Sequence, residues 1–288
     1  MKRALASLVL VLLALFSASS ASAQLTAAKD GPIVYGHHHL NATNIEEQKK
    51  FFVNALGGTA IKFGANNAEV VKFPNVLIFF RQQAPTGGTR GTTVNHIGFS
   101  VPNLRPVVDK IKANGYRMIT RTEVAASQEV KDDIATIAGR NVSIAFALGP
   151  DDVKVELVEV RDQAMPIALH HVHFFNQQNA EMQAWYVKVF GAKGGTGGGG
   201  AFPAANLPGV ALNFSPSPDP VVGTTGRSLD HIGFEVKDLE AFCKKLEEMG
   251  IKLTVAYRKV PALNIAIAFI NDPWGTNIEL TEGLDKVS

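Results

Sequence analysis

The chain has 288 residues, 46% of them hydrophobic and 19% charged, with a formal net charge of +2 at pH 7. Lys2 and Arg3 account for two of the 28 basic residues, so the rest of the chain carries 26 basic and 26 acidic residues. This balance argues against nucleic acid as a partner. Cys243 is the only cysteine, which excludes an internal disulfide and leaves stability to the hydrophobic core.

The N-terminus has the pattern of a secretory signal peptide. Two basic residues precede an apolar run at residues 8–16, which is too short to span a bilayer. Small residues ending at Ala23 fit a cleavage site. We therefore expect residues 1–23 to be removed and the mature protein to be periplasmic or extracellular, without membrane attachment.

All eight histidines fall in four short segments, at residues 35–40, 94–101, 169–174 and 229–236. Each segment reads as a strand that is followed by a helix and further strands, which indicates four copies of one unit. Helical spacing predicts helices that end near glycine at residues 44–56, 104–113, 180–190 and 239–249. Later strands are expected at residues 76–80, 116–123, 142–148, 153–158, 210–214 and 276–280.

The units repeat as a pair. The step from histidine to closing glycine is 20 residues from His37 and from His171, and 19 residues from His96 and from His231. We therefore predict two domains, at residues 24–161 and 162–288, each with two units. The glycine-rich residues 194–200 are expected to form a mobile connector. Together with residues 124–140, they are where substrate specificity would lie.

Two motifs carry a resemblance to a known family. His-x-Gly-Phe occurs at residues 96–99 and 231–234, and Asp-Pro-x-Gly-x3-Glu at residues 272–279. At these residues the chain resembles the vicinal oxygen chelate superfamily, which includes glyoxalase I, bleomycin-resistance proteins and extradiol dioxygenases. The resemblance covers nearly all of the mature chain. It implies an α+β fold in which four βαβββ modules form two cups, a small-molecule substrate, and a metal on the first and last strands; it leaves a homo-oligomer open.

Strand alternation places His231 and Glu279 on inward faces, with apolar neighbours turned to the core. Both candidate glutamates follow a proline by six residues. The predicted metal ligands form two sets, His171 with His231 and Glu279, and His37 with His96 and Glu156. In some four-unit relatives the first unit pairs with the fourth and the second with the third, which would exchange His37 and His171. His39 and His173 share the inward face, whereas His38 and His170 do not.

Two imidazoles and one carboxylate suit Fe(II) or Mn(II) and leave coordination positions open, and Zn(II) is the third candidate ion. Glyoxalase I has a fourth protein ligand, and the matching positions here are interpreted as Phe80 and Phe214. Their side chains favour an open, dioxygenase-like site. The extradiol signature has a tyrosine where this chain has Phe269. Tyr257, Arg258 and Lys259 lie nearby and are the residues that could take over as acid or base, with Tyr257 as the candidate.

The leading hypothesis is an exported metalloenzyme, dioxygenase-like or glyoxalase/lyase-like, that chelates a substrate through two adjacent oxygens. The alternative is a metal-free protein of the bleomycin-resistance type that sequesters a small ligand in the same cup. Metal content separates the two hypotheses.

Overall fold

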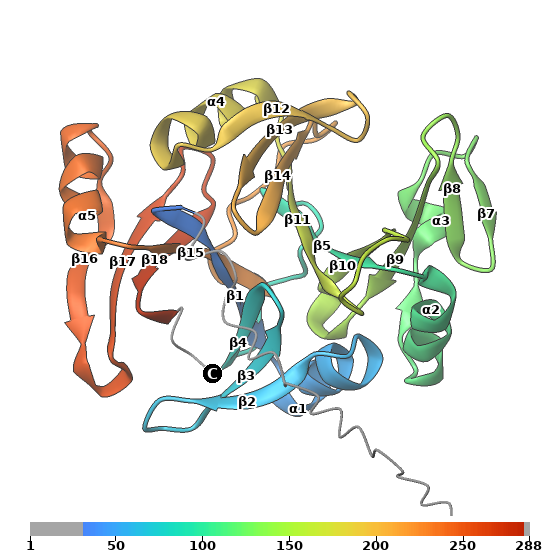
Figure 1. The fold of residues 1–288 in the computed structure, drawn as a ribbon, viewed down its shortest axis with the longest axis horizontal. Coiled ribbons are helices and arrows are strands. Elements are labelled where there is room, and N and C mark those ends of the chain that lie inside the picture. The colour runs from blue at the N-terminus through green and yellow to red at the C-terminus, as the bar shows by residue number, and fades with distance from the viewer. Residues whose placement is uncertain (1–30, 285–288) are drawn as a thin grey trace, which may run out of the picture.

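The computed structural model describes residues 31–284 (Figure 1). Within this range the chain forms two curved β-sheets with helices packed against them, an α+β architecture, as predicted. The eight-stranded sheet has the order β16-β17-β18-β15-β1-β4-β3-β2. The ten-stranded sheet has the order β12-β13-β14-β11-β5-β10-β9-β8-β7, with β6 paired to β9.

The four predicted units are present. The first is β1 (Ile33–Ala42), α1 (Ile45–Lys49), η2 (Lys50–Ala55), β2 (Thr59–Phe63), β3 (Ala68–Phe73) and β4 (Val76–Gln82). The second is β5 (Val94–Val101), α2 (Leu104–Ala113), β6 (Arg117–Met118), α3 (Thr120–Glu123), β7 (Glu129–Lys131), β8 (Ile134–Ile137), β9 (Val142–Leu148), η3 (Pro150–Asp152) and β10 (Lys154–Glu159). The third is β11 (Ala168–Phe175), α4 (Asn179–Phe190), β12 (Lys193–Gly197), β13 (Phe202–Leu207) and β14 (Val210–Ser215). The fourth is β15 (Leu229–Val236), α5 (Leu239–Glu248), β16 (Leu253–Val260), η4 (Pro261–Leu263), β17 (Ile265–Asn271) and β18 (Asn277–Glu282).

The expected helices are confirmed, and their ends follow local capping chemistry. Asn44, Asn103 and Asp238 each precede a helix and accept a hydrogen bond from a backbone amide of its first turn. Gly191 closes α4 with a left-handed backbone, φ 68°, which glycine adopts without strain. The first helix changes to a π-helical turn, η2, in its second half.

The pairing of units corrects the expected domains. The eight-stranded sheet joins the first and fourth units, and the ten-stranded sheet joins the second and third. In Figure 1 the N-terminal strand β1 accordingly lies beside β15. A short connection, residues 160–167, leads from β10 into β11 and keeps the third unit beside the second. Neither cup is therefore confined to residues 24–161 or 162–288.

One hydrophobic core serves both sheets. Its buried side chains come from all four units. The rings of Phe73 and Phe99 lie 4.7 Å apart between the first and second units, and those of Phe190 and Phe234 lie 4.4 Å apart between the third and fourth. Such aromatic contacts bury large apolar areas and fix the sheets against each other. The inward faces of the sheets are thereby left for polar side chains.

Two local expectations were wrong. The strand expected at residues 116–123 stops at Met118, because the Thr120 hydroxyl donates to the Asp133 carbonyl and accepts from the Phe146 amide, which holds α3 there instead. The connector expected at residues 194–200 is largely strand β12, and a side chain at Gly197 would overlap the Phe202 ring on β13. No helix among residues 31–284 is both long and apolar enough to cross a membrane.

Candidate metal centres

The first centre lies where β1 and β15 cross the middle of the eight-stranded sheet. The Nε2 atoms of His37 and His231 each lie 2.9 Å from the same carboxylate oxygen, Oε2 of Glu279. Both histidines are about 1% exposed. Because Glu279 on β18 is in register with Gly233 of β15, its carboxylate reaches the gap between the two rings. Three donors thus converge on one point.

The second centre repeats this arrangement in the ten-stranded sheet. Oε2 of Glu156 lies 2.8 Å from Nε2 of His96 and 3.1 Å from Nε2 of His171. His173 adds a further nitrogen, and the ligand atoms of all four residues lie within 4.8 Å of one another. Among residues 31–284, the second centre therefore has one more donor than the first, which groups His37, His231 and Glu279.

These distances correct the predicted sets. The six residues are brought together, but His37 joins Glu279 and His171 joins Glu156, the exchange expected if the first unit pairs with the fourth. The cause is the antiparallel register of the first strands, in which His37 faces Gly233 and His171 faces Gly98.

The glycine of each His-x-Gly-Phe motif makes room for the histidine of the partner unit. A side-chain carbon at Gly233 would overlap the His37 ring, and one at Gly98 would overlap the His171 ring. Each glycine therefore serves a ligand that is far away in sequence. The two first strands of each sheet are related by an approximate twofold axis. On the paired strand, His39 occupies the position equivalent to Gly233, and His173 occupies the position equivalent to Gly98.

Asp230 gives the first centre a second negative charge. Its Oδ1 lies 2.7 Å from Nδ1 of His231, and its Oδ2 accepts hydrogen bonds from the Gly226 amide and the Asn41 side chain. Burial opposes ionisation of Asp230, but the hydrogen bonds from His231 and Gly226 outweigh it and hold its pKa below the usual range. An ionised Asp230 accepts a hydrogen bond from the Nδ1–H of His231.

The orientation of the His231 ring determines whether a cation can bind between its Nε2 atom and Glu279. With its proton on Nδ1, neutral His231 presents the Nε2 lone pair to Glu279 at 2.9 Å. Two facing lone pairs repel unless a proton or a cation lies between them. Burial lowers the pKa of His231, but Asp230 and Glu279 more than reverse this and raise it above its usual value. The donor set therefore fits a divalent ion.

The surroundings of the second centre carry more positive charge. Asn95 replaces the aspartate, and its Oδ1 lies 3.0 Å from Nδ1 of His96. Lys154, on the same face of β10 as Glu156, is about 3% exposed and forms a 2.8 Å ion pair with Glu123. Burial, assisted by repulsion from Lys154, lowers the pKa of His96 to about 3. The pKa values of His231 and His96 are thus shifted in opposite directions.

The carboxylates of both centres are ionised. Burial would raise the pKa of Glu279, but its hydrogen bonds with His231 and His37 outweigh burial and hold it below the usual range. Burial likewise opposes ionisation of Glu156, yet attraction to His171 and hydrogen bonds with His171 and His96 keep its pKa well below normal. Each centre therefore offers a charged oxygen to a cation.

The position expected for a fourth protein ligand was assigned one residue too late on both β4 and β14. Phe80 and Phe214 point to the core, whereas Phe79 faces His39 and Asn213 faces His173 in register. Through the same approximate twofold axis, Phe79 occupies the position equivalent to Glu279, and Asn213 the position equivalent to Glu156. The first centre thus has a phenylalanine at the fourth position, and the second has an amide there. Strand parity was the signal that could have identified Asn213.

Phenylalanines flank both strand histidines. Phe269 lies 5.3 Å from the His231 ring and Phe146 lies 5.5 Å from the His96 ring, both edge-on. The position of the family's tyrosine therefore borders the first centre but carries no hydroxyl. Tyr257, the candidate to take over that role, packs against the hydrophobic core instead.

The remaining histidines divide as strand parity predicts. His38 is fully buried, with Nδ1 2.8 Å from the Tyr35 hydroxyl, and is a core residue. His170 lies beside the second centre, with Nδ1 2.8 Å from Nδ1 of His171. His39 faces inward, with its Nε2 buried and without a hydrogen-bond partner in the described chain.

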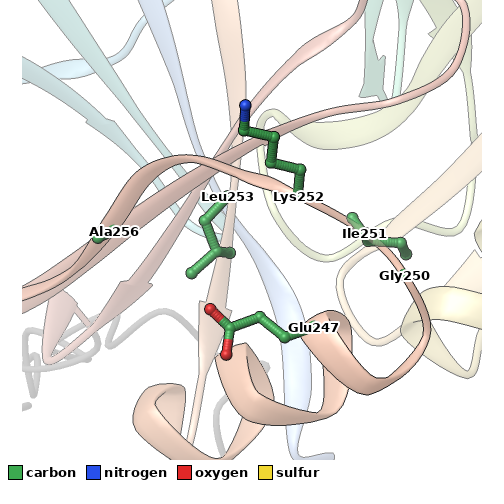
Figure 2. Close-up of a pocket in the computed structure, with 6 residues that line it drawn as sticks. All are labelled: Glu247, Gly250, Ile251, Lys252, Leu253 and Ala256. Carbon is green, nitrogen blue, oxygen red and sulfur yellow. The ribbon is translucent and has the colours of Figure 1, made fainter.

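A surface pocket lies apart from both centres. It has a volume of about 380 Å³, occupies the turn from α5 into β16, and is lined by Glu247, Gly250, Ile251, Lys252, Leu253 and Ala256 (Figure 2). Figure 2 shows the Glu247 carboxylate directed toward Leu253, with the Lys252 amine turned away. None of these residues belongs to either centre, so the pocket does not identify the site.

Comparison with known proteins supports the same architecture. Residues 168–280, which span the third and fourth units, match the family model of the Glyoxalase/Bleomycin resistance protein/Dioxygenase superfamily. This part of the chain is therefore similar to that superfamily. No curated protein sequence matches the chain.

Solved structures of superfamily proteins resemble the chain over most of its length. A mutant of glyoxalase I from Zea mays superposes with a TM-score of 0.67 and 17% identity, covering 90% of this chain and 97% of its own. Glyoxalase I itself from Zea mays gives 0.65 and 17%, covering 88% and 94%. A protein named as a dioxygenase from Bacillus subtilis gives 0.61 and 12%, covering 86% and 84%. At these identities the likeness establishes the fold.

Proposed function

We propose that the chain is a divalent-metal-dependent enzyme that acts on a small substrate through two adjacent oxygens. The observation that carries the proposal is the convergence of two imidazole Nε2 atoms on one carboxylate oxygen, both at 2.9 Å in the first centre. Imidazole and carboxylate together suit Fe(II) or Mn(II), and Zn(II) is the third candidate. The match of residues 168–280 to the Glyoxalase/Bleomycin resistance protein/Dioxygenase superfamily supports the proposal.

A divalent ion bound there would polarise the substrate oxygens and stabilise developing negative charge. The chain's own residues would do the rest. Phe79 and Phe269 border the first centre and would exclude water. His39 is the candidate proton acceptor, because it faces inward beside the first centre and its buried Nε2 has no hydrogen-bond partner within the described chain. Its ring lies 4.5 Å from that of His231.

Two reaction classes fit this frame. The three-donor first centre favours a dioxygenase-like reaction, because more coordination positions stay open. The second centre, with Asn213 at the fourth position, is closer to a glyoxalase/lyase-like donor set. Catechols and thiol adducts of α-oxoaldehydes are therefore the two substrate classes to assay.

The test combines metal analysis with those assays on the purified full chain. We expect bound divalent metal, activity toward one of the two classes, loss of activity with chelator and recovery with Fe(II) or Mn(II). His39→Phe should lower turnover at least about 100-fold, as for loss of a general base, while metal content is retained. A metal-free protein whose ligand affinity is insensitive to chelator would favour the binding-protein alternative.

We also propose that the protein is exported. The basic start, the apolar run at residues 8–16 and the small residues before Gln24 support this, although residues 1–30 lie outside the described structure. N-terminal sequencing of the protein from its source should begin at Gln24. A mature protein that retains Met1 would contradict export through this segment.

A further inference from the structure

The two centres share a His/His/Glu frame but differ in the charge around it. The first has two carboxylates, the half-buried Glu279 in the frame and the buried Asp230 behind His231. The frame of the second has one carboxylate, Glu156, and the nearby buried ammonium of Lys154 is paired with Glu123 at 2.8 Å, so that this pair adds no net charge. The residues at the corresponding positions are neutral, Asn95 in place of the aspartate and Asn277 in place of the lysine.

The donors differ as well. His173 belongs to the second group of ligand atoms, whereas His39, at the same position of the first unit, is absent from the first group. Nε2 of His173 is 2.8 Å from the Ser215 hydroxyl, and its buried Nδ1 has no hydrogen-bond partner within the described chain. A buried imidazole nitrogen without a partner is costly unless something binds it. The second centre is thus richer in nitrogen and poorer in negative charge.

We propose that the two centres sort divalent cations, the first preferring oxygen-seeking ions of the Mn(II) type and the second nitrogen-preferring ions of the Zn(II) type. The inference rests on the metal-dependent function proposed above. Carboxylate-rich sites suit Mn(II), and imidazole-rich sites suit Zn(II), Ni(II) and Cu(II). The second centre has no counterpart of the Asp230 charge, and the Lys154–Glu123 pair adds no net negative charge, so affinity there depends more on its imidazoles.

Asp230 is the positioning residue of the first centre. It orients the His231 ring through the 2.7 Å contact with Nδ1, and the Asn277 amide donates to the same carboxylate oxygen. It also adds the charge that the second centre lacks. Partners of this kind typically contribute 10- to 100-fold in metal affinity.

Two variants isolate the centres within the full chain. Glu156→Ala leaves the first centre intact, and Glu279→Ala leaves the second. Each protein is titrated with Mn(II), followed by the electron paramagnetic resonance signal of the free ion, and with Zn(II), by competition with a chromogenic chelator. We expect the ratio of Mn(II) to Zn(II) affinity to be at least about 10-fold higher at the first centre. Equal or reversed ratios overturn the inference, and loss of binding at both centres overturns the proposed function with it.

Substitutions that exchange charged and neutral residues between the two centres test whether charge causes the difference in ion preference. In the first-centre protein, Asp230→Asn keeps an acceptor for Nδ1 of His231 and should weaken Mn(II) about 10- to 100-fold, and Zn(II) less. In the second-centre protein, Asn95→Asp and Lys154→Asn should each strengthen Mn(II). Circular dichroism melts in chelator verify folding. If Asp230→Asn changes both affinities equally, the residue does not select the ion and the sorting fails.

Discussion

The two cups have the same strand frame and opposite electrostatic surroundings. In both, a histidine on each first strand meets a glutamate on a last strand, and a glycine admits the partner's ring. Yet the pKa of His231 is raised, whereas burial and Lys154 lower the pKa of His96 to about 3. Backbone register therefore fixes where the donors meet, and the neighbours one or two residues away determine what they can hold.

The largest expected effect comes from replacing the glycine that makes room for a ligand histidine in each centre. Gly233→Ala should abolish metal binding at the first centre and leave the second intact, because the new methyl group would displace His37. Gly98→Ala should do the reverse through His171. Gly195→Ala is the control, since no atom lies within 4 Å of the place its methyl group would take, and both centres should persist. Loss of both centres in either variant would contradict their separate assembly.

The glutamates test the charge of the frame. Glu279→Gln should weaken divalent metal binding at the first centre about 100-fold, because glutamine keeps an oxygen but removes the charge that attracts the cation. Glu156→Gln should act in the same way at the second centre. Isothermal titration of both variants and the parent measures this. Unchanged metal retention in Glu279→Gln would remove Glu279 from the ligands and favour the metal-free binding protein.

The turns before the two glutamates differ, and the difference should appear in stability. Asp272 accepts hydrogen bonds from the amides of Trp274 and Thr276 and from the Tyr186 hydroxyl, whereas Gly149 occupies this position in the second unit. Asp272→Ala should lower the free energy of unfolding by about 2–4 kcal/mol, since buried donors lose their acceptor. Urea denaturation measures the loss, and Asp272→Asn should restore part of it. No change would mean that the turn is held by other contacts.

A smaller effect is expected beside the second centre. Ser215 contacts Nε2 of His173, whereas Arg81 stands at the corresponding position of the first cup. Ser215→Ala should lower the free energy of unfolding by about 1 kcal/mol, the usual contribution of one hydrogen bond. Urea denaturation in chelator measures it, with Ser143→Ala on β9 as a control outside the centre. A neutral result for Ser215→Ala would mean that His173 is oriented by packing alone.

The sequence predicted most of the local elements. Apolar spacing with Asn44, Asn103 and Asp238 before the helices located them closely, because capping and periodicity are local. Strand parity likewise separated His38 from the inward-facing histidines. The assignment of Phe80 and Phe214 as the fourth position failed by one residue, and in a strand one residue reverses the face.

The grouping of the ligands needed the structure. His37 is close in sequence to His96 and far from Glu279, and all the candidate histidines have the same inward parity, so parity alone fits either pairing. The choice depends on which first strands pair at the centre of a sheet, a contact between β1 and β15 across much of the chain. Charge differences such as Asp230 against Asn95 were visible in the sequence, but their meaning required knowing which histidine each supports.

A crystal structure of the full chain with Mn(II), with anomalous diffraction recorded for the ion, would show directly whether the donors of the first and fourth units, and those of the second and third, each bind one ion. We expect one anomalous peak bounded by His37, His231 and Glu279, and at higher concentration a second bounded by His96, Glu156 and His171. A peak that joins His37 to Glu156, or the absence of peaks at both centres under saturating Mn(II), would contradict this expectation.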